Sequence, residues 1–582
     1  LDNASESEKI DLMFRFIQYV ERQVVLFDAI EDAAFPIVNN MEGRGSLRDI
    51  KEKTEAKDKR KELISFLETF NVRTVLTAHP TQFYPGSVLG IITDLTAAIR
   101  INDLIKIKQL LAQLGKTPFI KKEKPTPFDE AVSLLWYLEN VFYQTIGDMM
   151  QYLQKNIFEG NLIENPIVNL GFWPGGDRDG NPFVTPEITE KVAKRLRTSI
   201  LKCYYFDIRS LKRKLTFNEV DTIIAGLEYK LYRSVFYSQG EIFISLEELI
   251  NELTIVKNIV VEKHQSLYLD DINLLLQKIT QFGFHFASLD IRQNSKIHTK
   301  VFDDITAFLK REKSVVFPED FEQMTEVDKM AVVSHLKFDL SQHFFENEMT
   351  RTTLETIKLM QEIQTENGEK GCNRYIISNN ESALNVIETY AMFRLMGWEN
   401  PTVDIVPLFE SVDDLQNAHT IMEQLYQNSV YRQHLKERKD KQTVMLGFSD
   451  GTKDGGYLMA NWSIFKAKEM ITQVSREYGI KVIFFDGRGG PPARGGGKTH
   501  KFYASLGSTI ENQEIQLTVQ GQTISSQYGS IDSAEFNIEQ LINAGISTGM
   551  KEKHNVLLDE ANFSTLEKMA SDAYSAFLAL RK

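Results

Sequence analysis

Residues 481–497 read KVIFFDGRGGPPARGGG, in which a short apolar run ends abruptly in a loop of glycine and arginine. A continuous apolar run of this length is typical of a β-strand that is covered on both faces, as in a parallel sheet. A helical pattern follows the loop. The stretch therefore predicts a strand, a loop and a helix in succession, with polar residues at the end of the strand.

The same junction recurs along the chain. Seven further apolar runs end in polar or glycine-rich residues, at 72–76, 170–173, 284–289, 375–377, 403–408, 444–446 and 515–519. A (β/α)8 barrel has eight parallel strands and places its functional residues at their C-terminal ends. We therefore predict an α/β fold, a (β/α)8 TIM-like barrel with extensive additional α-helices that is mostly helical overall. A doubly wound sheet is the alternative.

Helical periodicity fills most of the remaining sequence, as in residues 131–158, 414–438 and 457–478. The charge run KEKTEAKDKRKELI at 51–64 is typical of a solvated helix face rather than of a binding patch. We expect three regions. They are an N-terminal helical region (1–70), an elaborated barrel (71–550) with helical insertions at about 95–165 and 190–275, and a C-terminal helical segment that is truncated (551–582).

Composition narrows the class of protein. The chain has 582 residues, of which 42% are hydrophobic, and a formal net charge of −13. The hydrophobic content suffices for a sizeable core and excludes a disordered chain. The acidic balance argues against a nucleic-acid coat or a polybasic membrane binder. Cys203 and Cys372 are the only cysteines and lie far apart, which excludes a disulfide framework and indicates a reducing compartment.

Membrane and export signals are not recognisable. No apolar run approaches the ~18 residues that a membrane-spanning helix needs. The first residues, LDNASE, are acidic and polar, unlike a signal peptide. We therefore expect a cytoplasmic protein without nucleic-acid or membrane partners.

The loop at 487–497, GRGGPPARGGG, is a candidate anion-binding loop. Its glycines let backbone N–H groups approach an anion closely. Arg488 and Arg494 add planar guanidinium groups that suit phosphate and carboxylate. The pattern is neither a P-loop nor a dinucleotide-binding turn. An anion-binding loop is favoured over a flexible surface loop because it follows a strongly apolar run.

Two carboxylates at predicted strand ends are candidate metal ligands. Glu410 follows VPLF and Asp450 follows MLGFS. Oxygen ligands from different strands suit Mg²⁺ or Mn²⁺, which keep waters and bind substrate oxygens directly. A helix N-cap for Asp450 and a surface position for Glu410 are the alternatives that spacing alone leaves open.

Three further segments carry candidate functional residues. His79 in LTAHPTQ precedes a proline that stiffens its backbone, as a general base requires, although a structural histidine is the alternative. The turn GGDRDGNP contains Asp177, Arg178 and Asp179, an arrangement that also serves as an internal ion-pair bracket. Lys453 in SDGTKDGG is either an exposed ion pair or a charge clamp beside a metal and a phosphate.

Taken together, these segments resemble the phosphoenolpyruvate carboxylase family of the bacterial type. Six motifs in the family's order carry the resemblance and extend over most of the chain. They are VLTAHPTQ (75–82), GFWPGGDRDGNPFVT (171–185), LDIRQ (289–293), VPLFESVDDL (406–415), VMLGFSDGTKDGG (444–456) and FFDGRGGPPARGGG (484–497).

The resemblance implies a reaction and partners. Phosphoenolpyruvate and bicarbonate would give oxaloacetate and phosphate through carboxyphosphate and an enolate that a divalent metal, Mg²⁺ or Mn²⁺, stabilises. By the same resemblance, this carbon dioxide fixation would replenish the tricarboxylic acid cycle. The family also implies an allosteric enzyme and a homo-oligomer, a tetramer.

The resemblance assigns roles to residues of this chain. His79, Lys453 and Arg494 match catalytic residues, with His79 as the base. Arg292, Arg488 and Arg494 match substrate-binding arginines, and Glu410 and Asp450 match the metal-binding acids. Asp177, Arg178, Asp179 and Asp486 are expected beside the site.

The chain departs from the family pattern at several places. Asp486 stands where the family commonly has histidine; it could orient Arg488 through a bidentate pair but cannot donate a hydrogen bond while ionised. Phe83 and Tyr84 follow the TAHPT segment in place of the usual arginine. Family members are usually longer, and their C-terminal GSRP-type loop is not recognisable here, so we expect a fragment or a short variant. A non-catalytic phosphoenolpyruvate-binding relative is the alternative function.

Overall fold

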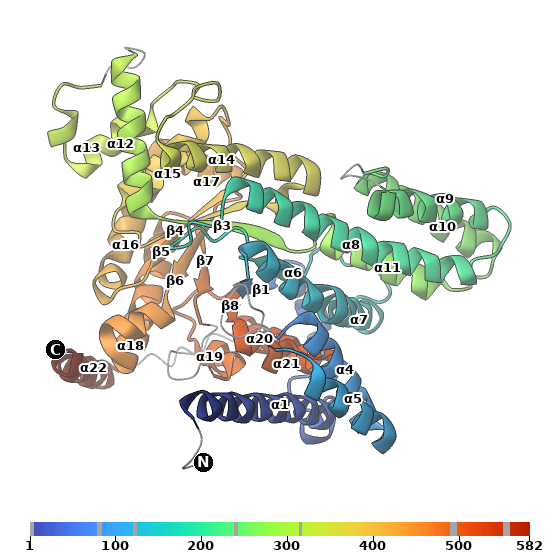
Figure 1. The fold of residues 1–582 in the computed structure, drawn as a ribbon. Helices are drawn as coiled ribbons and strands as arrows, with labels where there is room; N and C mark the ends of the chain where they lie inside the picture. Colours follow the sequence, from blue (N-terminus) through green and yellow to red (C-terminus); the bar gives the residue numbers. More distant parts are fainter. Residues whose placement is uncertain are drawn as a thin grey trace.

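The structure, a computed structural model, describes residues 5–77, 84–119, 125–237, 242–312, 317–488, 497–550 and 559–581. Within these ranges, eight parallel strands form a closed barrel in chain order, and β8 pairs with β1 (Figure 1). They are β1 (Asn71–Thr77), β2 (Val168–Phe172), β3 (Ser288–Asn294), β4 (Arg374–Ser378), β5 (Asp404–Phe409), β6 (Lys441–Leu446), β7 (Lys481–Asp486) and β8 (Glu514–Gln520). The predicted (β/α)8 barrel is therefore confirmed.

One predicted strand has different limits. The apolar run 284–289 predicts a strand that ends before Asp290, but β3 begins only at Ser288. Gly283 and Phe286 have φ angles of 50° and 61°, which no extended strand can accommodate. The first part of the run is therefore a turn, and Asp290 and Arg292 lie within the strand rather than after it.

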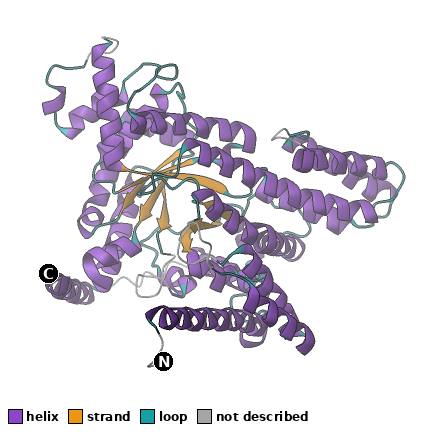
Figure 2. Ribbon diagram, viewed as in Figure 1, coloured by secondary structure: helices purple, strands orange, loops and turns teal. Residues whose placement is uncertain are grey.

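Helices connect the strands and surround the barrel (Figure 2). Those before β1 are α1 (Glu6–Val38), α2 (Leu47–Ala56) and α3 (Arg60–Leu67). Those between β1 and β2 are α4 (Gly86–Arg100), α5 (Leu104–Lys116), α6 (Pro127–Tyr137) and α7 (Tyr143–Asn156). Those between β2 and β3 are α8 (Pro186–Lys214), α9 (Val220–Tyr232), α10 (Leu246–Lys263) and α11 (Leu269–Phe282), which project together from the barrel (Figure 1).

The later connections are mostly shorter. Their helices are α12 (Ser295–Arg311), α13 (Glu326–Ser334), α14 (Glu348–Asn367), α15 (Ala383–Leu395), α16 (Val412–Gln427), α17 (Ser429–Glu437), α18 (Phe448–Glu477) and α19 (Thr499–Ser505). After β8 follow α20 (Gly521–Tyr528), α21 (Ile531–Gly549) and α22 (Glu560–Arg581). Of the helices that the structure describes, none combines the length and the apolar character needed to cross a membrane.

The predicted helical segments are helical, with different boundaries. The segment 131–158 runs through α6 and α7, and 414–438 is divided between α16 and α17. The charge run 51–64 is divided between α2 and α3. The helix predicted at 457–478 begins earlier, at Phe448, and is broken at Gly456, whose φ of 74° is open to glycine without strain. Asp450 and Lys453 consequently lie in the first turns of α18.

The barrel interior is layered. Near the N-terminal ends of the strands, Arg73 donates hydrogen bonds of 2.7 and 3.2 Å to Asp290, and Arg374 donates one of 2.5 Å to Gln516. The next layer is apolar and consists of Val75, Trp173, Ile376, Val406, Leu408, Met445 and Phe485. Because these side chains fill the barrel, a site can form only beyond them, at the C-terminal ends of the strands.

Glu388 of α15 is a buried carboxyl group outside the barrel. It is 7% exposed, and its Oε2 has no hydrogen-bond partner in the described part of the chain. Burial and the nearby charge of Asp303 raise its pKa to about 8. The folded state therefore binds a proton that the unfolded state releases, and stability falls as the pH rises from about 4.5 to about 8.

Replacing Glu388 with glutamine is expected to raise the melting temperature by about 2 °C or more at pH 8.5, because the neutral amide removes this penalty. At pH 5, where the buried carboxyl is protonated, the two proteins should melt within about 1 °C of each other. Glu362→Gln removes an exposed carboxylate of α14 and serves as the control. A stability difference that does not depend on pH would contradict the prediction, which scanning calorimetry checks.

Candidate active site

Arg292 lies at the centre of the candidate site. It is on the same face of β3 as Asp290, two residues closer to the C-terminal end of the strand. Its Nη2 is 2.5 Å from Asp179 Oδ2, and its Nε is 3.5 Å from Asp177 Oδ1. The guanidinium carbon lies 5.0 Å from the centre of the Trp173 ring. Two carboxylates and an aromatic face therefore fix this arginine at the mouth of the barrel.

The turn at 175–180 docks directly on β3. The Arg292 N–H donates to the Gly176 carbonyl at 3.0 Å, and the Arg178 N–H donates to the Arg292 carbonyl at 2.9 Å. A Cβ atom at Gly176 would lie 2.1 Å from the Asp290 carbonyl oxygen, so only glycine allows this approach. The close docking carries Asp177 and Asp179 to Arg292.

The charges of Arg292 and Asp179 stabilise each other. Burial opposes ionisation of Arg292, but Asp177 and Asp179 raise its pKa above the ordinary value. Burial also opposes ionisation of Asp179, and Arg292 reverses this effect and lowers the pKa of that carboxyl. Burial and Asp179 raise the pKa of Asp177 despite Arg292. Arg292 is therefore held as a permanent cation.

Arg178 points away from this cluster. Its guanidinium donates hydrogen bonds to the hydroxyl groups of Thr352 and Thr356 on α14, at 3.0 and 2.7 Å. The arginine of the acid–arginine–acid turn therefore fastens the turn to α14, while both acids face Arg292.

Glu410 and Asp450 lie close enough to interact electrostatically. Burial is the main cause that raises the pKa of Glu410 to about 7; Arg292 lowers it, and Asp450 and Asp179 raise it further. Glu410 Oε1 is buried without a hydrogen-bond partner among the described residues. Asp450 is half exposed and accepts a hydrogen bond of 2.8 Å from Lys453.

These acids fit a divalent cation. A buried carboxylate oxygen without a partner, beside a second carboxylate, is stabilised by a positive charge. Mg²⁺ and Mn²⁺ are commonly held by one or two carboxylates, with water and substrate oxygens in the remaining positions. Glu410 and Asp450 would supply the two carboxylates. No group of three or more potential ligands from His, Cys, Asp and Glu occurs in the described ranges.

Arg488 follows β7 and is held by aromatic rings. Its guanidinium carbon is 4.1 Å from the centre of the Phe502 ring and 5.2 Å from that of Phe448, the first residue of α18. Burial lowers its pKa, and the residue is 8% exposed. Phe448 places Arg488 beside the helix that carries Asp450 and Lys453.

Asp486 does not form the side-chain pair with Arg488 that we considered for it. Its carboxylate lies 2.8 and 2.9 Å from Lys468 Nζ and accepts a hydrogen bond of 2.8 Å from the Tyr503 hydroxyl. Lys468 and Tyr503 were not among the predicted site residues. A signal for Lys468 was present, since it lies at helical spacing from Ile464 and Ile471 on the apolar side of its helix.

The structure thus brings Asp177, Asp179, Arg292, Glu410 and Asp450 together, with Lys453 bonded to Asp450. Arg488 contacts Phe448, which lies two residues before Asp450. His79 and Arg494 lie outside the described residues.

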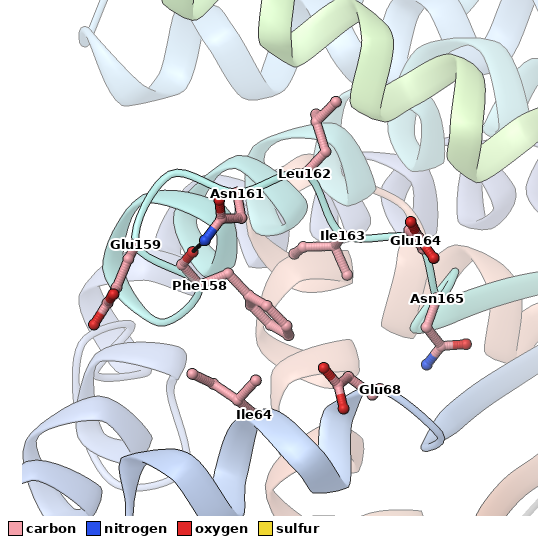
Figure 3. Close-up of a pocket in the computed structure, with 9 residues that line it drawn as sticks. All are labelled: Ile64, Glu68, Phe158, Glu159, Asn161, Leu162, Ile163, Glu164 and Asn165. Atoms are coloured by element: carbon pink, nitrogen blue, oxygen red, sulfur yellow. Dashed lines mark hydrogen bonds between the residues drawn. The ribbon is translucent and has the colours of Figure 1, made fainter.

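A cavity of about 510 Å³ lies elsewhere (Figure 3). Its lining includes Glu68 and Asn165, which precede β1 and β2, so it lies at the N-terminal ends of these strands. Glu159 and Glu164 add further carboxylates. A cavity lined by acids at the opposite end of the barrel from Arg292 does not suit an anionic substrate.

Fold and site together define a (β/α)8-barrel protein that combines fixed arginines with a pair of carboxylates at the C-terminal face of the barrel, the usual place of a barrel enzyme's active site. A model of the family described as phosphoenolpyruvate carboxylase matches residues 18–234 and 221–581. The chain belongs to this family, so the family that the six motifs predict is confirmed, and the bacterial type stays a prediction. Membership implies a carboxylase that acts on small-molecule substrates.

Proposed function

We propose that the protein converts phosphoenolpyruvate and bicarbonate to oxaloacetate and phosphate, and thereby replenishes the tricarboxylic acid cycle. A bicarbonate oxygen attacks phosphorus, and the bond from phosphorus to the enol oxygen breaks, giving carboxyphosphate and the enolate of pyruvate. A base removes the carboxyphosphate proton, and the molecule separates into CO₂ and phosphate. The enolate carbon then forms the new bond to CO₂.

The residues of the site support these steps. In our proposal Arg292 and Arg488 bind the phosphoryl group and stabilise its charge as it moves between oxygens. Lys453 adds a positive charge at the start of α18, beside Asp450. In our proposal His79 is the base and Arg494 holds substrate. A divalent cation on Glu410 and Asp450 would act as a Lewis acid toward the enolate oxygen.

The fixed position of Arg292 within reach of Glu410 is the observation that carries the proposal. A substrate with a phosphoryl group beside an enol oxygen matches a fixed cation beside a metal-binding carboxylate. The cytoplasmic location, the tetramer and allosteric control remain proposals drawn from the family.

The test is oxaloacetate formation, coupled to NADH oxidation by malate dehydrogenase. We expect turnover that requires phosphoenolpyruvate, bicarbonate and Mg²⁺ or Mn²⁺ together. Omitting bicarbonate and adding a chelator are the controls. A protein that binds phosphoenolpyruvate in calorimetry but forms no oxaloacetate would instead be the non-catalytic relative, which Asp486 in place of the family's histidine favours. A protein that neither binds phosphoenolpyruvate nor forms oxaloacetate would contradict both the proposed function and this alternative.

A further inference from the structure

Asp486 places a buried negative charge next to the proposed phosphate site. It is the last residue of β7, fully buried, and lies two residues before Arg488. A carboxylate in this position is a potential partner for the guanidinium group and would compete with an anionic substrate for it.

Lys468, which lies on α18, binds this carboxylate. Its Nζ reaches both oxygens of Asp486, at 2.8 and 2.9 Å, and the Tyr503 hydroxyl donates to Oδ2 at 2.8 Å. The Lys468 side chain is 1% exposed. The ammonium group is therefore a dedicated partner for Asp486, inside the protein.

Aromatic rings hold both cations of this region. Lys468 Nζ lies 5.1 Å from the ring centres of Phe484 and Phe502, and the Arg488 guanidinium carbon lies 4.1 Å from that of Phe502. The Arg488 N–H donates to the Asp486 carbonyl at 2.8 Å, which fixes the backbone from which the arginine extends. One ring thus contacts the ammonium group that binds Asp486 and the guanidinium group that we assign to the substrate.

We propose that Lys468 is a positioning residue: it binds the carboxylate of Asp486 so that the charge of Arg488 is directed to the phosphoryl group of the substrate. The inference rests on the substrate-binding role proposed for Arg488. It also accounts for the tolerance of aspartate at a position where the family commonly has histidine, because the buried lysine balances the added negative charge.

Lys468→Met tests the proposal. Without the ammonium group, the carboxylate of Asp486 loses its lysine partner and competes with the substrate for Arg488, and the KM for phosphoenolpyruvate should rise about tenfold or more while kcat changes less. In Lys468→Met/Asp486→Asn the competing carboxylate is absent, and KM should return to within about threefold of the wild-type value. If Lys468→Met does not fold, Lys468→Gln retains a hydrogen bond to Asp486 and permits the same comparison.

Lys278→Met is the matched control. Lys278 is 3% exposed and pairs with Asp207 at 3.0 Å; it lies on α11, the helix that leads to the N-terminal end of β3. Its loss should lower the melting temperature as Lys468→Met does but leave KM unchanged. A wild-type KM in Lys468→Met, or a KM equally raised in the double variant, would overturn the proposal.

A crystal structure of Lys468→Met separates this inference from the proposed function. We expect the Arg488 guanidinium within hydrogen-bond distance of the Asp486 carboxylate. An Arg488 that keeps its place on Phe502 would overturn the inference, even if the wild-type protein turns over phosphoenolpyruvate. Conversely, the expected movement would support it even if the wild-type protein proved inactive.

Discussion

Replacing Glu410 with glutamine is expected to abolish tight Mn²⁺ binding and to lower kcat for carboxylation by about 10³-fold. The amide is neutral and leaves Asp450 as the single carboxylate of the pair. Because burial already raises the pKa of Glu410 to about 7, a neutral side chain of the same shape should not destabilise the fold. Mn²⁺ titration calorimetry, steady-state kinetics and a melting curve measure the three effects separately.

Glu381→Gln is the matched control for this change. Glu381 also follows a barrel strand, β4, but is exposed and lies 3.7 Å from Lys296 rather than beside Asp450. Its replacement should leave Mn²⁺ affinity and kcat unchanged. Wild-type Mn²⁺ affinity in Glu410→Gln would remove Glu410 from the proposed metal site.

Replacing Arg292 with methionine is expected to lower kcat/KM for phosphoenolpyruvate by about 10⁴-fold. One preorganised donor accounts for about 10²–10³ of this loss. The remainder arises because Asp177 and Asp179 lose their cation and then repel the substrate phosphoryl group. Steady-state kinetics and calorimetric titration with phosphoenolpyruvate measure the loss.

The repulsion between these carboxylates and the substrate can be measured separately with Arg292→Met/Asp179→Asn. This variant still lacks the arginine but has one repelling carboxylate fewer, so it should bind phosphoenolpyruvate about tenfold more tightly than Arg292→Met. Asp179→Asn alone should weaken binding, since Arg292 loses its closest anchor. Equal affinity of the single and double arginine variants would show that repulsion plays no part.

The barrel could be predicted because its strands are covered on both faces. The runs in β4 and β7, YII and VIFF, are continuously apolar, and polar residues mark the ends of most strands. The start of β3 could not be predicted, since the residues around Phe286 are as apolar as a strand. Their turn is visible only in the positive φ angles of Gly283 and Phe286.

Those candidate site residues that lie at or near the ends of strands could be predicted from the sequence. Arg292, Glu410 and Asp450 each stand at or near a strand end, and parallel strands bring such positions together. Contacts between remote segments could not be predicted. Arg178 is directed by threonines of α14, and Asp486 by a lysine eighteen positions earlier on another element.

The break at Gly456 has a consequence for how this chain can vary. The first part of α18 carries Asp450 and Lys453, and the second carries Lys468. The second part packs against α22, where Glu567 accepts a hydrogen bond from Trp462. In an unbroken helix, each inserted residue would rotate all later residues by about 100° about the helix axis. The non-helical residue Gly456 interrupts this register, so Lys468 in the second part need not keep a fixed helical register with Asp450 in the first.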